Sequence, residues 1–216
     1  MPEKKGEDKM ILTDKDIRCL SLGDKKKNLS GGMITPFDEI SLQSESYDLS
    51  IGCMITTMKK EVRCIDVTAQ EDLDFMYDKK ELPLTGYVLS PKEYVIVSIK
   101  ESIKMPENIT AHIRPRTRFT RMGLIVSDQH CNSSYEGNLK LGLFNATDFA
   151  IKIFPGVKIA QIVFEELKEK PSEEKLYLNK KDAAYHKEES FIGAMVDEEF
   201  DKKVTEAVSF LLEKGK

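Results

Sequence analysis

The stretch Arg114-Pro-Arg-Thr-Arg-Phe-Thr-Arg-Met-Gly-Leu124 places four arginines within eight residues, with two threonines among them. Apolar residues alternate before this stretch and a short apolar run follows it, which predicts a turn between two strands. Guanidinium groups donate in a rigid fork that matches phosphate oxygens, and threonine hydroxyls add further donors. The stretch therefore predicts an anion site, best matched by a polyphosphate. A solvated basic turn is the alternative on arginine count alone.

Composition limits the function classes. A chain of 216 residues predicts one domain with appendages, and the net charge of -4 argues against a general nucleic-acid binder. Four cysteines lack Cys-x-x-Cys spacing and three histidines are scattered, so we expect no zinc site, the neighbours His130 and Cys131 included. No apolar run could span a bilayer and the start lacks the apolar core of a signal peptide, so we expect a cytoplasmic protein without a membrane partner.

The N-terminal part predicts little regular structure. Residues 1–9 are charged and read as a disordered extension. Thr13 followed by Asp16 resembles a capping box that opens a short helix through about Leu20. The segment Ile34–Phe37 is expected to be extended, because the residue before a proline is excluded from the helical region.

Residues 47–167 predict mostly strands with turns between them. In the segment Asn138–Asn145, leucines occupy every second position and so share one face of a strand. Turns are expected at Ser90–Glu93 and at Pro155-Gly156. The other strands are expected at Val62–Val67, Tyr94–Ile99 and Val157–Phe164. Many short strands predict a mainly β fold of sandwich or barrel type.

The C-terminal part has a different composition. Residues 168–190 are charged and loop-like, with Tyr177 and Tyr185 as their large anchors. Residues from about 197 to 214 predict an amphipathic helix, because apolar side chains recur at three- and four-residue intervals. Docking of this helix on its own domain is the first interpretation, and a subunit or partner contact is the second.

Six segments resemble, in order, those of one superfamily: Met10–Ile17, Ile34–Phe37 with Leu42–Gly52, Leu89–Tyr94, the arginine stretch, Tyr135–Gly137 and Phe154–Phe164. This is the dCTP deaminase/dUTPase superfamily, and the resemblance is to its dCTP deaminase-like branch. It covers about residues 10–190 and implies a distorted β-barrel or jelly-roll domain with a short N-terminal helix. Residues 191–216 would then be an added helical appendage. The resemblance also implies a homotrimer with nucleotide sites between subunits.

The resemblance implies a deoxynucleoside triphosphate, dCTP or dUTP, as ligand. Magnesium would be held through the phosphates, without zinc and without protein ligands. Thr117 and Arg121 would support catalysis. The nucleotide-binding positions would be Arg116, Thr117, Arg118, Asn132, Tyr135 and Tyr177.

The chain departs from the family where chemistry would occur. The position of the proton-carrying glutamate falls on Gly142, which cannot carry a proton. A glycine inside a strand suggests a close approach or an opened pocket on the face shared with Lys140. Asn132 stands where trimeric dUTPases have a water-activating aspartate. The phosphate-closing segment is Ala184–Glu188, in which the family's lysine is lost and an acid replaces its glutamine.

Three functional hypotheses follow. The first is a nucleotide-binding protein with deaminase activity absent or strongly reduced. The second is an active dCTP deaminase or dUTP pyrophosphatase with a relocated carboxylate, Asp128 or Glu136, whereas Asp48 reads as structural. The third is a trimeric scaffold or partner subunit. Arg114 and Arg118 exceed what the family pattern asks for, which indicates an anion ligand or ion pairs across a subunit interface.

Overall fold

The computed structural model describes residues 11–23, 30–61, 63–180, 183–188, 190–196 and 198–214, so the expected extension 1–9 lies outside it. The helices are α1 (Asp14–Leu22), α2 (Gln70–Phe75), α3 (Thr117–Met122) and α4 (Glu198–Lys214), with short 3-10 turns η1 (Glu39–Ser41), η2 (Glu173–Lys175) and η3 (Tyr177–Asn179). The strands are β1 (Ile34–Thr35), β2 (Tyr47–Met58), β3 (Tyr77–Glu81), β4 (Tyr87–Leu89), β5 (Tyr94–Lys104), β6 (Ile109–Pro115), β7 (Leu124–Val126), β8 (Gln129–Cys131), β9 (Glu136–Asn145), β10 (Ile151–Ile153) and β11 (Lys158–Glu166).

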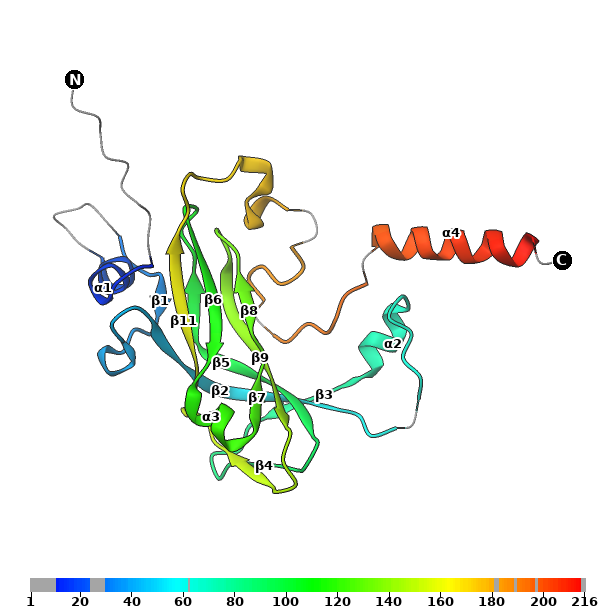
Figure 1. Cartoon of the computed structure of the whole chain (residues 1–216), viewed down its shortest axis with the longest axis horizontal. Coiled ribbons are helices and arrows are strands. Elements are labelled where there is room, and N and C mark those ends of the chain that lie inside the picture. Colours follow the sequence, from blue (N-terminus) through cyan, green and yellow to red (C-terminus); the bar gives the residue numbers. More distant parts are fainter. Residues whose placement is uncertain are drawn as a thin grey trace.

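One curled antiparallel sheet forms the body of the molecule, as a half-barrel (Figure 1). Its main order is β7-β9-β5-β2-β11-β6-β8, with β1 beside β5 and β3 beside β2. Strands β4 and β10 form a separate pair. The expectation of a mainly β, barrel-like or jelly-roll domain with a short N-terminal and an added C-terminal helix is confirmed, and the sheet itself is curled into a half-barrel.

The long strand β2 turns the sheet. Its first part, Tyr47–Ser50, pairs with β11, and the part from Met54 onward pairs with β3. The register against β5 shifts between Ile51 and Ile55, where Gly52 lies. A Cβ at Gly52 would lie 2.8 Å from the Ser98 hydroxyl, so a larger residue would obstruct the approach of the two strands.

The core follows the predicted alternation. Leu139, Leu141 and Leu143 on β9 are buried, while the residues between them face the other side or the cavity described below. Tyr47 and Phe164, from β2 and β11, are the largest fully buried side chains among the described residues. The capping box of Thr13 and Asp16 opens α1 as expected, and α1 ends two residues later than predicted.

The predicted strand Val62–Val67 is wrong for the described residues 63–67, which form a loop. Asp66 and Asp72 explain the error. The Asp72 carboxylate accepts from the Asp66 amide at 3.0 Å and pairs with Arg63. The Asp66 carboxylate accepts from the Thr68 amide at 2.9 Å. These side-chain bonds offer the backbone an alternative to pairing in a sheet.

The arginine stretch is not a simple turn. Residues 117–122 form α3, and Arg116 precedes it with extended backbone. Gly123 ends the helix with a left-handed φ of 74°, a conformation that favours glycine. A short helix therefore presents Thr117, Arg118 and Arg121 on the protein surface.

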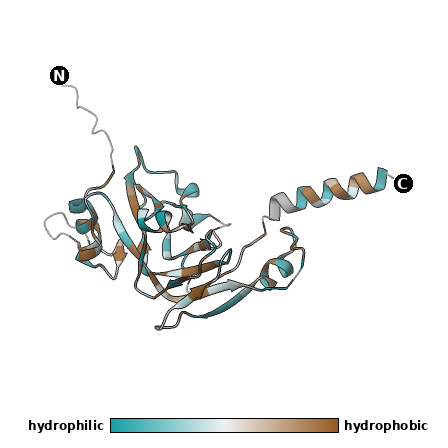
Figure 2. Cartoon of the chain, turned by 60° about the horizontal axis from the view of Figure 1, so that its bottom comes forward, coloured by the Kyte–Doolittle hydropathy of each residue, from teal (hydrophilic) through white to brown (hydrophobic). Residues whose placement is uncertain are grey.

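The C-terminal helix α4 forms as predicted. The interpretation that it docks on its own domain is wrong, because apolar side chains along it are exposed. Val208 is 49 % exposed, and Leu211 and Leu212 are each 67 % exposed. Figure 1 shows α4 extending away from the sheet, and Figure 2 shows apolar residues along it. No helix in the described part of the chain is long and apolar enough to cross a membrane.

A buried ion pair joins β2 to the start of α3. The Asp48 side chain is only 3 % exposed, and its Oδ2 lies 2.8 Å from Arg116 Nη1. Gln43 Nε2 donates to the same oxygen at 3.2 Å. Burial raises the pKa of Asp48, and Arg116 opposes that rise. The contact fits the interpretation of Asp48 as a structural residue.

We predict that Arg116→Met lowers the free energy of unfolding by about 1–3 kcal/mol at pH 7, because the buried carboxylate loses its cation. A raised folded-state pKa means that ionisation of Asp48 opposes folding, and the variant raises this pKa further. The loss of unfolding free energy in the variant should therefore become smaller as the pH falls toward the pKa of an aspartate in unfolded chains, about 3.9. Urea unfolding at pH 7 and pH 4.5 measures it.

The matched control is Arg118→Met, two residues along on the exposed surface of α3. It should change stability by less than about 0.5 kcal/mol. Equal losses in the two variants, or a loss independent of pH, would contradict the structural role of the ion pair.

Candidate functional site

A cavity of about 430 Å³ lies between strands β5, β8 and β9 and the C-terminal segment. Rings dominate its walls: Tyr77, Tyr94, Tyr135, Tyr177, Tyr185 and Phe191. Gln129, His130 and Asn132 add polar groups. Aromatic faces with a few polar groups suit a flat heterocyclic ligand.

Gly142 and Tyr94 meet at the cavity wall. A Cβ at Gly142 would lie 2.7 Å from Tyr94 Cζ and 2.9 Å from Cε2, with the hydroxyl closer still. The close approach expected at this glycine is therefore confirmed. The outer end of the ring of Tyr94, a residue that is 40 % exposed, occupies the space beside position 142, so a side chain there would have to displace it. A tyrosine hydroxyl is protonated at neutral pH, and burial raises the pKa of Tyr94 further.

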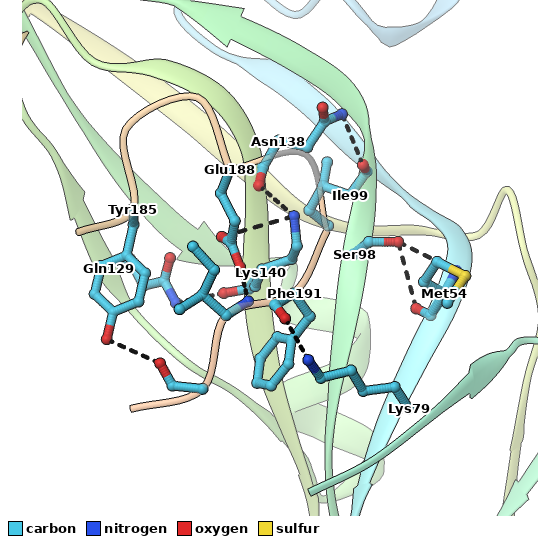
Figure 3. Close-up of polar contacts among 12 residues, drawn as sticks. Met54, Lys79, Ser98, Ile99, Gln129, Asn138, Lys140, Tyr185, Glu188 and Phe191 are labelled. Carbon is cyan, nitrogen blue, oxygen red and sulfur yellow. Dashed lines mark hydrogen bonds and ion pairs between the residues drawn. The ribbon is translucent and has the colours of Figure 1, made fainter. Parts of the chain in front are cut away.

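Lys140 and Glu188 form an ion pair on the same wall, drawn in Figure 3. Their side chains are 13 % and 3 % exposed, and Nζ lies 3.8 Å from Oε2. Lys140 Nζ also donates to the Asn138 carbonyl at 2.9 Å, and Glu188 Oε1 accepts from the Ile192 amide. Burial lowers the pKa of Lys140, and Glu188 acts in the opposite direction.

Glu188 is the one carboxylate among the described residues that line the cavity. The sequence singled out Asp128 and Glu136 as relocated carboxylates, and neither lines it. Asp128 pairs with Arg114 at 3.2 Å and Glu136 pairs with Lys187 at 3.6 Å. In the sequence, Glu188 stands out only as the acid that replaces the family's glutamine in the segment Ala184–Glu188. Its position in the segment 184–188, which matches the family's phosphate-closing segment, was the sequence feature that could have placed it near the cavity.

Residues 190–196, which follow the segment Ala184–Glu188 and are called the closing segment below, complete the wall of the cavity. Lys79 Nζ donates to the Phe191 carbonyl at 2.8 Å, as Figure 3 shows, and the Ala194 amide donates to Tyr77 Oη at 3.1 Å. Gln70 donates to the Ala194 carbonyl at 3.2 Å and accepts from the Val196 amide at 3.1 Å. Contacts from α2 and β3 therefore hold this segment in place.

The predicted site residues fall into two groups. Asn132, Tyr135 and Tyr177 line the cavity, and the rings of the two tyrosines lie 5.8 Å apart. Arg116, Thr117, Arg118 and Arg121 do not line it. Arg116 is bound to Asp48, whereas Thr117, Arg118 and Arg121 are exposed. Within one chain the arginines of α3 and the cavity lie apart.

Metal-binding groups are not gathered in the described part of the chain. No three His, Cys, Asp or Glu side chains there lie where they could hold an ion. His112 and His130 come close, with ring centroids 5.0 Å apart across β6 and β8. The neighbouring Cys131 is buried, which raises the pKa of its thiol to about 12.

The fold resembles a known one. The 2'-deoxycytidine 5'-triphosphate deaminase from Agrobacterium tumefaciens superposes with a TM-score of 0.58 at 22 % identity. The match covers 73 % of this chain and 48 % of that chain, so this chain spans about half the length of that protein. At this identity the likeness establishes a shared fold, the half-barrel of these deaminases.

Sequence relatives make the assignment specific. The "dCTP deaminase, dUMP-forming" of Persephonella marina is 32 % identical over 161 residues, covering 74 % of this chain and 86 % of the relative. The dCTP deaminase of Ignicoccus hospitalis is 29 % identical over 147 residues, covering 67 % and 81 %. The family model described as dCTP deaminase-like matches residues 11–167. The chain belongs to the dCTP deaminase-like family. Tyr177, Glu188 and the closing segment lie beyond that match.

We predict that Gly142→Ala costs about 1–3 kcal/mol of unfolding free energy, because its Cβ displaces the Tyr94 ring. In a Tyr94→Leu background the same substitution should cost much less, since the shorter side chain leaves room. Urea unfolding of the four proteins in this cycle gives the coupling, expected at about 0.5–3 kcal/mol. The same small cost in both backgrounds would refute the close contact.

Proposed function

We propose that this protein binds a pyrimidine deoxynucleoside triphosphate, dCTP or dUTP, and that its deaminase activity is absent or strongly reduced. The observation that carries the proposal is the contact between Tyr94 and Gly142. In the family this position holds a proton-carrying glutamate. Here it has no side chain, and the space beside it is filled by a ring.

The binding half of the proposal rests on two regions, the aromatic cavity and the exposed polar side chains of α3, which we take as the two halves of one site. The aromatic cavity suits stacking of a pyrimidine base. The exposed Arg118, Arg121 and Thr117 suit phosphate oxygens. Because these groups lie outside the cavity of their own chain, a complete site requires α3 of a neighbouring copy. A homotrimer with sites between subunits satisfies this requirement.

Magnesium fits this arrangement as part of the ligand. The described residues offer no cluster of three acidic or histidine side chains, so Mg²⁺ would be held by the phosphate oxygens. Its contribution would be to neutralise phosphate charge. The arginines of α3 would then orient the triphosphate relative to the cavity.

The chemical half concerns proton transfer. Replacing the amino group of cytosine by oxygen requires a water to lose a proton and the leaving ammonia to gain one. A positioned acid/base typically contributes a factor of about 10²–10⁴. Gly142 offers no such group, and the Tyr94 hydroxyl holds its proton at neutral pH. Bound nucleotide would therefore remain unreacted.

An active enzyme is the second candidate, and Glu188 is the observation that favours it. Its carboxylate lies on the cavity wall, where a relocated proton carrier would be needed. However, one oxygen accepts from the Ile192 amide and the other faces Lys140. Glu188 would have to leave both partners before it could serve a substrate. The binding role therefore remains the better supported one.

We predict that dUTP with Mg²⁺ raises the melting temperature of the wild-type protein, and that Arg121→Met weakens its binding about tenfold or more, since a charge-assisted hydrogen bond is lost. Lys152→Met, an exposed charge on β10, is the control and should bind normally. Calorimetric titration gives the affinities, and light scattering should give three times the 24.6 kDa of one chain. Failure of both dCTP and dUTP to bind or stabilise the protein would overturn the proposal.

A further inference from the structure

Lys140 determines the hydrogen-bonding character of the cavity wall. It lies two residues before Gly142 on β9, so both positions are on the same face of the strand. The side chain at position 142 is missing, so the charged group that this face presents to the cavity is an ammonium. An ammonium has three donors and no acceptor.

The position of Lys140 is fixed by the sheet. Strand β9 pairs with β5 on one side, where Lys140 lies opposite Ser98, and with β7 on the other side further along. The side chain is 13 % exposed, so its charge needs acceptors close by. Those acceptors are the Asn138 carbonyl and Glu188, and Glu188 comes from the irregular C-terminal segment.

The acceptors next to Lys140 already receive hydrogen bonds or ion pairs from the protein. The carbonyl of Lys140 accepts from Gln129 Nε2 at 2.7 Å. Glu188 Oε1 accepts from the Ile192 amide, and its Oε2 faces the ammonium. A base edge that enters beside Lys140 therefore meets its ammonium group. This group donates and cannot accept, and the protein already balances its charge through Glu188.

We propose that Lys140 makes this cavity selective for a 4-keto pyrimidine, of the uracil type, over a 4-amino pyrimidine such as cytosine. The inference rests on the proposed function, because it assigns the base preference of that site. A keto oxygen at C4 accepts from Lys140, whereas the cytosine amino group would oppose one donor with another. Leaving a buried charged donor opposite another donor weakens binding by about tenfold to a hundredfold.

The test is calorimetric titration of the full-length protein, with Mg²⁺, using dUTP and dCTP. Their bases differ at C4, which is keto in uracil and amino in cytosine, and at N3, which carries a proton in uracil alone. We expect dUTP to bind at least about tenfold more tightly. Lys140→Met, of similar length and uncharged, should bring the ratio close to one. Glu188→Gln should leave the preference for dUTP in place. Chromatography of the recovered nucleotides shows whether dCTP stayed intact during the titration.

Equal or tighter binding of dCTP by the wild type would overturn the inference, as would an unchanged ratio in Lys140→Met. Loss of the preference in Glu188→Gln alone would assign selectivity to the carboxylate and overturn it too. Lys140→Arg retains a donor-only cation and should retain the preference, which keeps the test decisive if the methionine variant fails to fold. Binding without a keto preference refutes this inference alone, whereas no triphosphate binding refutes the proposed function as well.

Discussion

The ion pair between Asp48 and Arg116 is the constraint that ties the arginine stretch to the sheet. Asp48 lies on the first part of β2, where this strand pairs with β11, and its carboxylate is almost fully buried. An uncompensated charge there would be costly, so Arg116 is held against it at the entry to α3. One arginine of the stretch thereby becomes structural. The contact fixes where α3 starts and leaves its other polar side chains facing solvent.

Two coupled changes define the cavity. The first pairs the missing side chain at Gly142 with the ring of Tyr94, two positions that differ by 48 in sequence but belong to neighbouring strands. The second places Lys140 against Glu188, which introduces a cation on the wall and neutralises it from the C-terminal segment. Where the family pattern has a glutamate, the wall of this cavity has the ring of Tyr94 and, beside it, the ion pair of Lys140 and Glu188. Under the proposed function, this cavity would hold a base without transferring a proton.

Sequence reasoning reached the fold because the strands carry a strong local pattern. The leucines of β9 alternate with period two, and the order of the family segments indicated a barrel-like β domain, whereas the strand order came from the structure. It failed at residues 63–67, because hydrogen bonds of Asp66 and Asp72 with the backbone outweighed β propensity. The departure at Gly142 could be read from one position. That the Tyr94 ring lies against Gly142 could not be predicted, because this contact depends on the register of β5 against β9. The role of Glu188 likewise arises from tertiary contacts of an irregular segment.

The central claim is that this chain keeps the nucleotide site of its family without the group that performs the reaction. Its most direct test is to incubate the wild-type protein with dCTP and Mg²⁺ and to follow the formation of uracil nucleotides and the release of pyrophosphate. We predict that dCTP is recovered unchanged, or consumed at least about a hundredfold more slowly than by ordinary enzymes, whose turnover numbers are about 1–10³ s⁻¹. Turnover of dCTP within that ordinary range would contradict the claim.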